Sequence, residues 1–476
     1  MAFERTIVIL AAGQGTRMKS SLPKVLHPIA GVPMVTFAID AALALDPERI
    51  VVVVGHGREQ VESAARARFG DRVVFALQEQ QRGTADAVRA ALPHIPATSR
   101  EVVITYGDCP LVPGAFLQRL VRARADSDAL MSVATTRLDD PTGYGRIISG
   151  SASAPSGARS VLAIREHKDC TEQERAIDVI NAGLYSVDRV FLERALAQID
   201  SSNAQGEFYL TDLVSLANRD ESSRPKALEL RGDAALLRGI NDRAELADAE
   251  AHMLEIINDR WRRAGNTIAR GVRIDRDVRL EQDVTISQGA VLRGRTRVAA
   301  NAIVDVGCVL DDADIAESVH LKPYSIVSRS KIGPRAQIGP FAHVRPDSEV
   351  AEDAHVGNFV ELKKTRMGKG AKANHLAYLG DGVIGASANI GAGTIFCNYD
   401  GTKKSTTTIG ERAFVGSNSS LVAPVVIGDD AYVGSGSVVN KDVPKGALAI
   451  ARARQENKEG YVAKLRAMKQ GGGEKP

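Results

Sequence analysis

The hydrophobic pattern divides the chain into two halves with different periods. In the first half, to about residue 240, β-branched runs at 6–10, 49–55, 72–77 and 101–108 are separated by helical patterning, as at 33–45 and 84–92. Strands and helices that alternate at this rhythm predict an open, mostly parallel α/β sheet, with ligands at the carboxyl ends of its strands. The small, polar stretch 150–160 predicts a surface loop.

A single long helix is predicted between the halves, over 242–264. Its apolar positions recur at steps of three and four, as in Leu246, Ala249, Met253, Ile257 and Trp261. Asp242 followed by Glu245 is typical of a capping box, and Gly265 is a suitable helix stop. We interpret this helix as the linker between two domains.

In the second half the period changes to six. Apolar residues occupy every sixth position in runs joined by single steps of five, and one break of thirteen residues follows Phe396; the runs are 274–310, 315–327, 332–362, 367–379, 384–396 and 409–439. Neither an α-helix nor an ordinary strand has this period, whereas a parallel β-helix of hexapeptide repeats does. Each flat side of a coil then contributes one inward residue, which predicts about nine coils, with small residues such as Gly339, Gly357, Gly410 and Gly428 at the corners.

The pattern therefore predicts four regions. They are an α/β domain at 1–241, the linker helix at 242–264, a β-helix at 265–451 and a basic tail at 452–476 that is partly flexible and frays after about Met468.

Composition narrows the function classes. Lysine and arginine number 61 against 58 aspartate and glutamate, so a dedicated nucleic-acid binder or a polybasic membrane protein is excluded, although small anionic substrates are not. The four cysteines, Cys109, Cys170, Cys308 and Cys397, are far apart, which disfavours a zinc site or a disulfide framework and fits a reducing compartment. No run approaches the roughly 18 apolar residues of a membrane span, and we expect a cytoplasmic protein without membrane insertion.

The first predicted strand leads into a glycine loop with cations beyond it. Gly13 and Gly15 allow backbone N–H groups to approach an anion, and Arg17 and Lys24 follow. The spacing is neither the dinucleotide fingerprint nor the phosphate loop of P-loop enzymes. Two cations placed here can stabilise the charge that develops in phosphoryl or nucleotidyl transfer, although a tight turn with surface cations would look the same.

The segment LAAGQGTRM followed by LPKVLH resembles the signature of sugar nucleotidyltransferases. Together with the period-six half, residues 5–455 resemble the bacterial family of bifunctional N-acetylglucosamine-1-phosphate uridyltransferases and glucosamine-1-phosphate acetyltransferases. The resemblance implies a Rossmann-like nucleotidyltransferase domain and a left-handed β-helix acetyltransferase domain. It implies two activities in the synthesis of UDP-N-acetylglucosamine: acetylation of glucosamine-1-phosphate by acetyl-coenzyme A, and uridylyl transfer from UTP to N-acetylglucosamine-1-phosphate with release of pyrophosphate.

The family's uridylyl site can be transferred to this chain residue by residue. Arg17 and Lys24 are implied as catalytic, and Asp108 and Asn241 as ligands of Mg²⁺. The implied nucleotide and sugar contacts are Leu10, Ala11, Ala12, Gly13, Gln78, Gly83, Thr84, Tyr106, Gly107, Gly145, Glu166, Asn181 and Asn241. A carboxylate after a buried strand suits Mg²⁺, and the Gln78 amide can match the donor and acceptor edge of a pyrimidine. Without the resemblance, Asp108 and Asn241 would equally be turn or capping residues.

The acetyl site is implied in the same way. His375 matches the catalytic base, and an imidazole can accept a proton near neutral pH, although the residue alone would be read as a surface histidine. The implied contacts to the sugar phosphate and to acetyl-coenzyme A are Arg345, Lys363, Tyr378, Asn389, Ala392, Asn398, Tyr399, Lys404, Ser417, Ser435 and Arg452. Ser435 departs from the family, in which alanine is common, and a backbone contact there would tolerate the change.

The break after Phe396 predicts a loop that leaves the coils, because its residues cannot fill a six-residue side. Left-handed β-helices of this kind resemble trimer-formers, so we expect a homotrimer in which this loop carries Lys404 to a neighbouring copy.

Two other readings remain open on the sequence. One is a nucleotidyltransferase with a single activity, whose β-helix serves only oligomerisation or regulation. The other is a non-enzymatic scaffold built from the same folds. The presence of Arg17, Lys24 and Asp108 argues against a scaffold, and His375 with the outward loop argues against a single activity.

Overall fold

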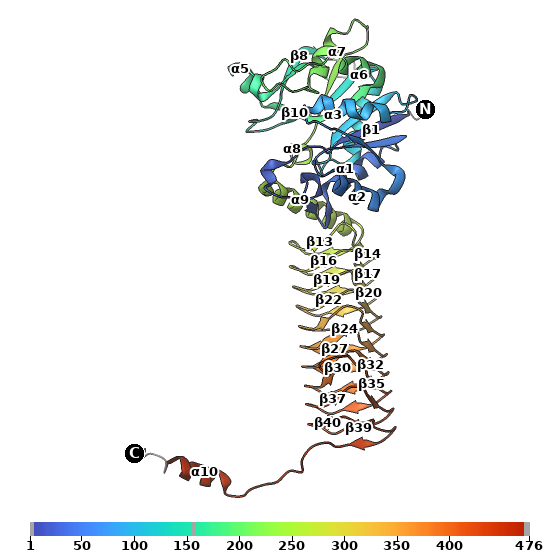
Figure 1. The fold of residues 1–476 in the computed structure, drawn as a ribbon, viewed down its shortest axis with the longest axis vertical. Coiled ribbons are helices and arrows are strands. Elements are labelled where there is room, and N and C mark those ends of the chain that lie inside the picture. The colour runs from blue at the N-terminus through green and yellow to red at the C-terminus, as the bar shows by residue number, and fades with distance from the viewer. Residues whose placement is uncertain (1–3, 154–158, 471–476) are drawn as a thin grey trace. The chain divides into compact units, whose positions relative to one another are not determined.

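The computed structural model describes residues 4–153 and 159–470, and contacts within the chain group it into two compact units, 1–257 and 258–476 (Figure 1). The division falls inside helix α9 (Arg243–Arg263), which occupies the segment predicted to be one long helix. Gly265 follows it with a φ of 96°, a left-handed conformation that suits glycine at a helix end.

The first unit is built on one large mixed sheet. Its order in the described residues is β5-β4-β1-β6-β10-β7-β11-β9-β8. The strands are β1 (Arg5–Leu10), β4 (Arg49–Val54), β5 (Val74–Leu77), β6 (Glu101–Tyr106), β7 (Met131–Arg137), β8 (Arg146–Ser153), β9 (Arg159–Arg165), β10 (Val179–Asp188) and β11 (Ala227–Arg231). Strands β5, β4, β1 and β6 are mutually parallel, as the alternation of strands and helices predicts. Strand β10 runs antiparallel to both β6 and β7.

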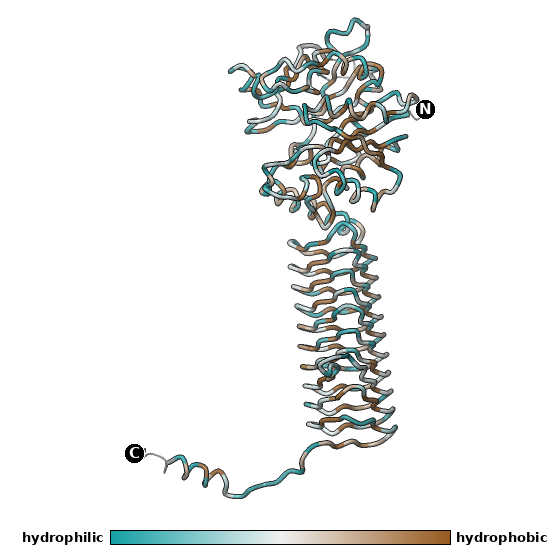
Figure 2. Tube along the Cα trace, in the orientation of Figure 1, coloured by the Kyte–Doolittle hydropathy of each residue, from teal (hydrophilic) through white to brown (hydrophobic). Residues whose placement is uncertain are grey.

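Helices cover both faces of this sheet. Alternate residues of β1 enter two hydrophobic cores: Ile7 and Ile9 pack with α1, α2 and α4, whereas Val8 and Leu10 pack with α3, α6 and α7. The helices are α1 (Met34–Leu43), α2 (Arg58–Phe69), α3 (Thr84–Ala91), α4 (Gly114–Ala125), α5 (Glu172–Arg175), α6 (Arg189–Leu196), α7 (Asp212–Arg219) and α8 (Ala234–Leu237), with a small hairpin of β2 (Pro28–Ile29) and β3 (Val32–Pro33). Burial of the sheet on both faces explains the nearly continuous apolar runs of β1 and β4. Figure 2 shows brown segments of the tube gathered where Figure 1 labels β1.

The prediction of a surface loop at 150–160 is wrong at both ends of this stretch. Strand β8 continues to Ser153, and β9 begins at Arg159 and pairs with it antiparallel. Ladder hydrogen bonds therefore outweigh the low strand propensity of this Ser/Ala/Gly sequence. The rest of the stretch, 154–158, lies outside the described residues.

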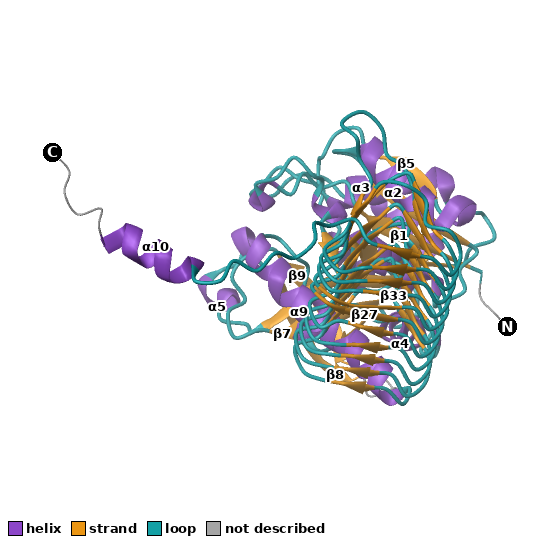
Figure 3. Ribbon diagram, turned by 90° about the horizontal axis from the view of Figure 1, so that it is seen from below, coloured by secondary structure: helices purple, strands orange, loops and turns teal. Residues whose placement is uncertain are grey.

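The second unit is a prism of three parallel sheets, which we name sheets I, II and III. Successive coils lie over one another when viewed along the coils in Figure 3. Sheet I contains β12 (Thr267–Ile268), β15 (Thr285–Ile286), β18 (Ile303–Val304), β21 (His320–Leu321), β24 (Gln337–Ile338), β27 (His355–Asn358), β30 (Lys372–His375), β33 (Asn389–Ile390), β36 (Phe414–Val415), β39 (Tyr432–Val433) and β41 (Leu448–Ala449). Sheet II contains β13 (Arg273–Ile274), β16 (Val291–Arg293), β19 (Val309–Asp311), β22 (Ile326–Ser328), β25 (His343–Val344), β28 (Glu361–Lys363), β31 (Tyr378–Gly380), β34 (Ile395–Cys397), β37 (Ser420–Val422) and β40 (Val438–Val439). Sheet III contains β14 (Arg279–Leu280), β17 (Arg297–Val298), β20 (Asp314–Ile315), β23 (Lys331–Ile332), β26 (Glu349–Val350), β29 (Arg366–Met367), β32 (Gly382–Ile384), β35 (Thr407–Ile409) and β38 (Val425–Ile427).

The period-six positions form the interior of this prism. Every apolar position predicted to point inward, from Ile274 to Val439, is buried. The prediction missed the first such position, because Ile268 of β12 is also buried, six residues before Ile274. The β-helix therefore begins one strand earlier than the pattern indicated. Strand β41 extends it at the other end, and the described strands make ten coils where about nine were predicted.

The corners between sheets I and II all use left-handed backbone. Gly307, Gly393 and Gly436 have φ between 69° and 75°, and Asn418 has a φ of 55° at the equivalent position. Four consecutive coils carry large apolar residues there instead, with φ between 49° and 58°: Tyr324, Phe341, Phe359 and Leu376. The prediction that glycine and small residues turn the corners therefore holds only in part, since the ladder hydrogen bonds of neighbouring coils impose the strained conformation on bulky residues as well.

Past the coils, the described part of the tail contains helix α10 (Tyr461–Gln470). The expected fraying concerns residues that lie mostly outside the described ranges.

Candidate active sites

The glycine loop and its two cations lie at the carboxyl edge of the first sheet. Ala11 donates from its backbone to Val53, and the Gly107 N–H donates to the Leu10 carbonyl, so the ends of β1, β4 and β6 are tied together. Parallel strands end at a common edge, which is why the loop after β1 and Asp108 after β6 meet there.

Two charged contacts join the cations to the candidate metal ligands. The Lys24 ammonium forms an ion pair with the Asp108 carboxylate, with both side chains largely buried. Arg17 Nη2 donates to Asn241 Oδ1 at 2.8 Å, across 224 residues of chain. The Ile240 N–H donates to the Asp108 carbonyl at 3.0 Å and holds the two ligand-bearing segments side by side. The structure thus brings Arg17, Lys24, Asp108 and Asn241 into one cluster.

The cluster has the chemistry of a magnesium site that is completed by substrate. It offers one carboxylate and one amide oxygen, and each now faces a cation that a metal ion could replace. Within the described ranges, no three His, Cys, Asp or Glu side chains form a metal cage. Mg²⁺ does not need one, because it keeps several waters and binds through one or two protein oxygens together with phosphate.

Gln78 is buried beside a hollow next to the glycine loop. Its Nε2 donates to the Gly83 carbonyl and to Asp86, both at 3.1 Å, so only its carbonyl oxygen can face a ligand. This narrows the predicted donor–acceptor match to a single acceptor. The hollow, of about 510 Å³, is lined by Gln14, Gly55, His56, Leu77, Gln78, Glu79 and Gln81. Thr84 does not face it, because its hydroxyl accepts from the Leu210 N–H at 3.1 Å.

The three candidate sugar residues also lie together. The Asn181 N–H donates to the Gly145 carbonyl at 2.9 Å, and a side chain at Gly145 would contact Glu166. Glu166 accepts from the Thr211 hydroxyl at 3.1 Å, but burial still raises the pKa of its carboxyl group above the usual value. Tyr106 reaches from β6 toward this group, since its ring lies against Gly183 of β10, and burial strongly raises its pKa.

In the second unit, the candidate acetyl residues form one column. His375, Ala392, Ser417 and Ser435 occupy the same position of the corner between sheets I and II, on four successive coils. The next coil brings Arg452 close to Gly436. At about 4.8 Å per coil, the column from His375 to Ser435 spans roughly 14 Å.

The imidazole of His375 is oriented by the coil before it. Its Nδ1 lies 2.6 Å from Asn358 Oδ1. An amide oxygen only accepts, so Nδ1 carries the proton and Nε2 keeps a lone pair that can take one. The sequence reading missed Asn358, although it lies seventeen residues, one coil, before His375.

The candidate phosphate contacts lie on sheet II beside this column. Arg345, Lys363 and Tyr378 lie on or just after neighbouring strands. Tyr378 contributes to raising the pKa of both Arg345 and Lys363. Arg345 donates to Glu361 at 2.7 Å, and Lys363 lies 3.5 Å from Asp381. Asn398 also donates to Asp381. A phosphate would therefore displace these carboxylates, which the sequence analysis did not identify.

The loop after Phe396 leaves the coils but remains close to its own chain. Tyr399 and Lys404 pair across an exposed turn. Lys404 lies beside Lys363, whose ammonium group lowers the pKa of Lys404. Within its own chain Lys404 thus lies beside one of the candidate phosphate contacts, and the expectation that it reaches a neighbouring copy stays a prediction. Asn389 stands on the outer side of sheet I, one coil after Lys372.

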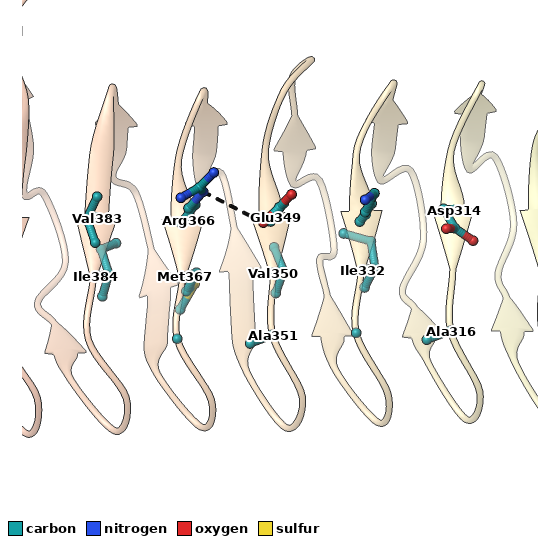
Figure 4. Close-up of a pocket in the computed structure, with 13 residues that line it drawn as sticks. Asp314, Ala316, Ile332, Glu349, Val350, Ala351, Arg366, Met367, Val383 and Ile384 are labelled. Carbon is teal, nitrogen blue, oxygen red and sulfur yellow. Dashed lines mark ion pairs between the residues drawn. The ribbon is translucent and has the colours of Figure 1, made fainter.

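A larger hollow, of about 620 Å³, lies on sheet III and contains none of the predicted site residues. Figure 4 shows its outer column, in which Asp314, Glu349 and Arg366 stand on parallel strands with Arg366 3.7 Å from Glu349. Exposed cross-strand ion pairs of this kind contribute little stability.

Comparisons with known proteins assign both units. A MobA-like NTP transferase domain matches residues 7–173, and bacterial transferase hexapeptide repeats match 329–364 and 406–441. Over its whole length, the chain is 52% identical to the bifunctional protein GlmU of Sorangium cellulosum, with 97% of each chain covered. It is 48% identical to that of Anaeromyxobacter sp. strain Fw109-5, over 98% of this chain and 94% of the other. The chain belongs to the bifunctional GlmU family.

The chain is also 44% identical to the bifunctional protein GlmU of Brevibacillus brevis, over 96% of this chain and 97% of that one. The chain is accordingly a bifunctional transferase with uridylyltransferase and acetyltransferase activities in UDP-N-acetylglucosamine synthesis. Its substrates include nucleotide sugars and acetyl-coenzyme A. In the described residues, no helix is both long and apolar enough to cross a membrane.

Proposed function

We propose that the first unit performs uridylyl transfer at the Arg17–Lys24–Asp108–Asn241 cluster. The observation that carries this proposal is the pairing of both cations with both candidate metal ligands, Lys24 with Asp108 and, across 224 residues of chain, Arg17 with Asn241. An oxygen of N-acetylglucosamine-1-phosphate attacks the α-phosphorus of UTP, the bond to the bridging oxygen breaks and pyrophosphate leaves. Arg17 and Lys24 stabilise the charge that develops on the phosphates.

The remaining residues of this unit hold the substrates. Gln78 accepts from the uracil N3–H, the backbone from Leu10 to Gly13 approaches the phosphates, and Gly145, Glu166 and Asn181 receive the sugar. Asp108 and Asn241 would hold Mg²⁺, which neutralises phosphate charge when bound. Lys24 and Arg17 then move from these oxygens to the triphosphate.

In the second unit, His375 is proposed as the base of acetyl transfer. The amine nitrogen of glucosamine-1-phosphate attacks the thioester carbonyl while Nε2 of His375 takes its proton. The C–S bond then breaks, and coenzyme A leaves as the thiol after it receives that proton. Arg345, Lys363, Tyr378 and Lys404 hold the phosphate of the sugar. Ala392, Ser417, Ser435 and Arg452 follow the extended thioester arm along the column, and Asn389, Asn398 and Tyr399 border it.

We further propose a homotrimer through the corner that carries Tyr324, Phe341, Phe359 and Leu376. These side chains are 48–60% exposed, and the three rings stack at centroid distances of 5.2 and 5.4 Å. Exposed apolar residues held in strained backbone need a compensating contact, and the ladder continues directly into the His375 column. A second copy packed there would border the acetyl site. Because UTP and acetyl-coenzyme A are intracellular metabolites, the cytoplasm is the proposed compartment.

The test of the proposed function is Asp108→Ala, assayed for both reactions. Pyrophosphate release from UTP and N-acetylglucosamine-1-phosphate should be lost, because the metal has only one other protein ligand. Coenzyme A release with glucosamine-1-phosphate should stay near normal, since that site lies on the other unit. Equal loss of both activities in a folded variant would contradict the assignment.

A further inference from the structure

The Arg238–Glu245 ion pair lies between two segments of the proposed uridylyl site: the sugar segment at Gly145 and the metal-holding segment at Asn241. Glu245 Oε2 accepts from the backbone N–H of Asn241 at 2.6 Å. Glu245 Oε1 accepts from Arg238 Nη2 at 3.2 Å. The carboxylate of Glu245, in the first turn of α9, therefore fixes the backbone of the candidate metal ligand Asn241 as well as the end of the helix.

Arg238 in turn reaches the sugar segment. It interacts with the side chain of Tyr144, which raises the pKa of Arg238 and immediately precedes Gly145. The Tyr144 carbonyl is itself held by the buried Arg146, and the Gly145 carbonyl by the Asn181 N–H. A continuous polar path thus runs from the sugar segment through Arg238 and Glu245 to Asn241.

The pair has room to rearrange. Arg238 and Glu245 line a cavity of about 180 Å³ together with Gly239 and Ile240, the residues that lead into Asn241. Their side chains are 48% and 28% exposed, so the pair is not locked in a packed core. A shift of Tyr144 when sugar phosphate binds would move Arg238, and with it the Asn241 backbone.

We propose that Glu245 and Arg238 are positioning residues that couple the sugar segment to the metal-holding segment, so that sugar phosphate and metal–nucleotide strengthen each other's binding. The inference rests on the proposed assignment of Asn241 as a metal ligand. Groups that orient metal ligands are typically worth 10–100-fold in metal affinity or activity. The competing explanation is that Glu245 only caps α9.

The experiment measures Mn²⁺ binding by electron paramagnetic resonance in the presence of α,β-methylene-UTP, which does not react, with and without N-acetylglucosamine-1-phosphate. Without the sugar, Glu245→Ala should weaken Mn²⁺ binding by about tenfold. Glu245→Gln keeps an acceptor for the Asn241 N–H and should lose less. Asp248→Ala removes a carboxylate one turn further along α9, in the same cavity, and should bind as the wild type does.

The coupling is read from the change in Mn²⁺ affinity that the sugar phosphate causes. In Arg238→Ala and in Tyr144→Phe this change should fall toward onefold, and the double variant should show no further loss, since both act through one path. The thermal transition that UTP shifts upward, which belongs to the first unit, reports that each variant is folded.

Asn241→Ala distinguishes failure of the metal assignment from failure of the positioning role. If it binds Mn²⁺ as the wild type does, the metal assignment is wrong. If it weakens binding but Glu245→Ala matches Asp248→Ala, or if Arg238→Ala keeps the full sugar effect, the positioning role is overturned.

Discussion

At the residue scale, His375 depends on a neighbour that has no chemical role of its own. Asn358 accepts from Nδ1 and so fixes which imidazole nitrogen can take a proton. The same hydrogen bond strengthens as the imidazole becomes charged, which favours the transition state.

We expect His375→Ala to reduce acetyl transfer by about 10²–10⁴, the usual contribution of a general base. Asn358→Ala should cost about tenfold, the equivalent of one hydrogen bond to a charged group of about 1.5 kcal/mol. The measurement is the pH dependence of coenzyme A release, with the thermal transition of the second unit as the control for folding. A pH profile left unchanged by His375→Ala would exclude the imidazole as the base.

Glu166 shows the cost of a buried carboxylate in a sugar site. Because burial raises its pKa in the folded state above the value of 4.5 in the unfolded chain, the folded protein binds this proton more tightly. Its contribution is therefore fully favourable below that value and is lost as pH rises through the folded pKa.

Glu166→Gln removes this titration. The variant should gain thermal stability relative to the wild type as pH rises from about 4 to about 7, because only the wild type loses the contribution of the protonated carboxyl group. Calorimetry checks this on the transition that UTP shifts upward. The KM for N-acetylglucosamine-1-phosphate should rise at the same time. A constant difference in melting temperature at every pH would show that the carboxyl group does not titrate differently on folding.

At the element scale, the position of the acetyl column depends on how closely coils can stack at a corner. A Cβ at Gly357 would lie 1.9 Å from the Asn374 carbonyl oxygen, which is backbone and cannot move aside. Gly357 precedes Asn358 and Asn374 precedes His375, so this close approach sets the separation of the pair that forms the base.

Gly357→Ala should therefore displace the coil that carries His375 and reduce acetyl transfer by at least tenfold, since even one lost hydrogen bond to a charged group costs about that much. Gly434→Ala is the matched control, because it occupies the equivalent corner position, where the nearest atom to an added Cβ is a side-chain carbon at 3.3 Å. Both variants are assayed for acetyl and uridylyl transfer. Equal effects of the two substitutions would contradict the stacking argument.

At the scale of the whole molecule, the exposed ladder of Tyr324, Phe341, Phe359 and Leu376 is the proposed contact between copies. Phe359→Asp places a charge in the middle of the ladder. Sedimentation should show the trimer dissociating, and acetyl transfer should fall while uridylyl transfer persists, because only the acetyl column borders the ladder.

Val383→Asp provides the control for this prediction. Val383 is 43% exposed on sheet III, away from the ladder, and its substitution should leave the assembly intact. If Val383→Asp dissociates the protein and Phe359→Asp does not, the interface lies on sheet III instead.

The period-six pattern and the strand runs determined the architecture without help from the structure. Both patterns arise from local burial. In the β-helix one inward position on each side of a coil must be apolar, and in a sheet covered on both faces the strands must be apolar throughout. The signal fails at its margins. Ile268 lies six residues before Ile274 and so continues the same period, but as an isolated first position it was not counted. The stretch 150–160 was misread because its strands are held by ladder hydrogen bonds, which leave no apolar pattern.

Only the tertiary structure decided which polar groups meet. The contacts of Arg17 with Asn241 and of Glu166 with Thr211 join residues 224 and 45 positions apart, and no local pattern encodes such distances. The carboxylate partners of Arg345 and Lys363, the single free acceptor of Gln78 and the position of Lys404 beside Lys363 emerged in the same way. Hydrophobic periodicity is a property of consecutive residues, whereas a polar site is a property of where chain ends, corners and loops converge, and that convergence is fixed by the packing of the whole fold.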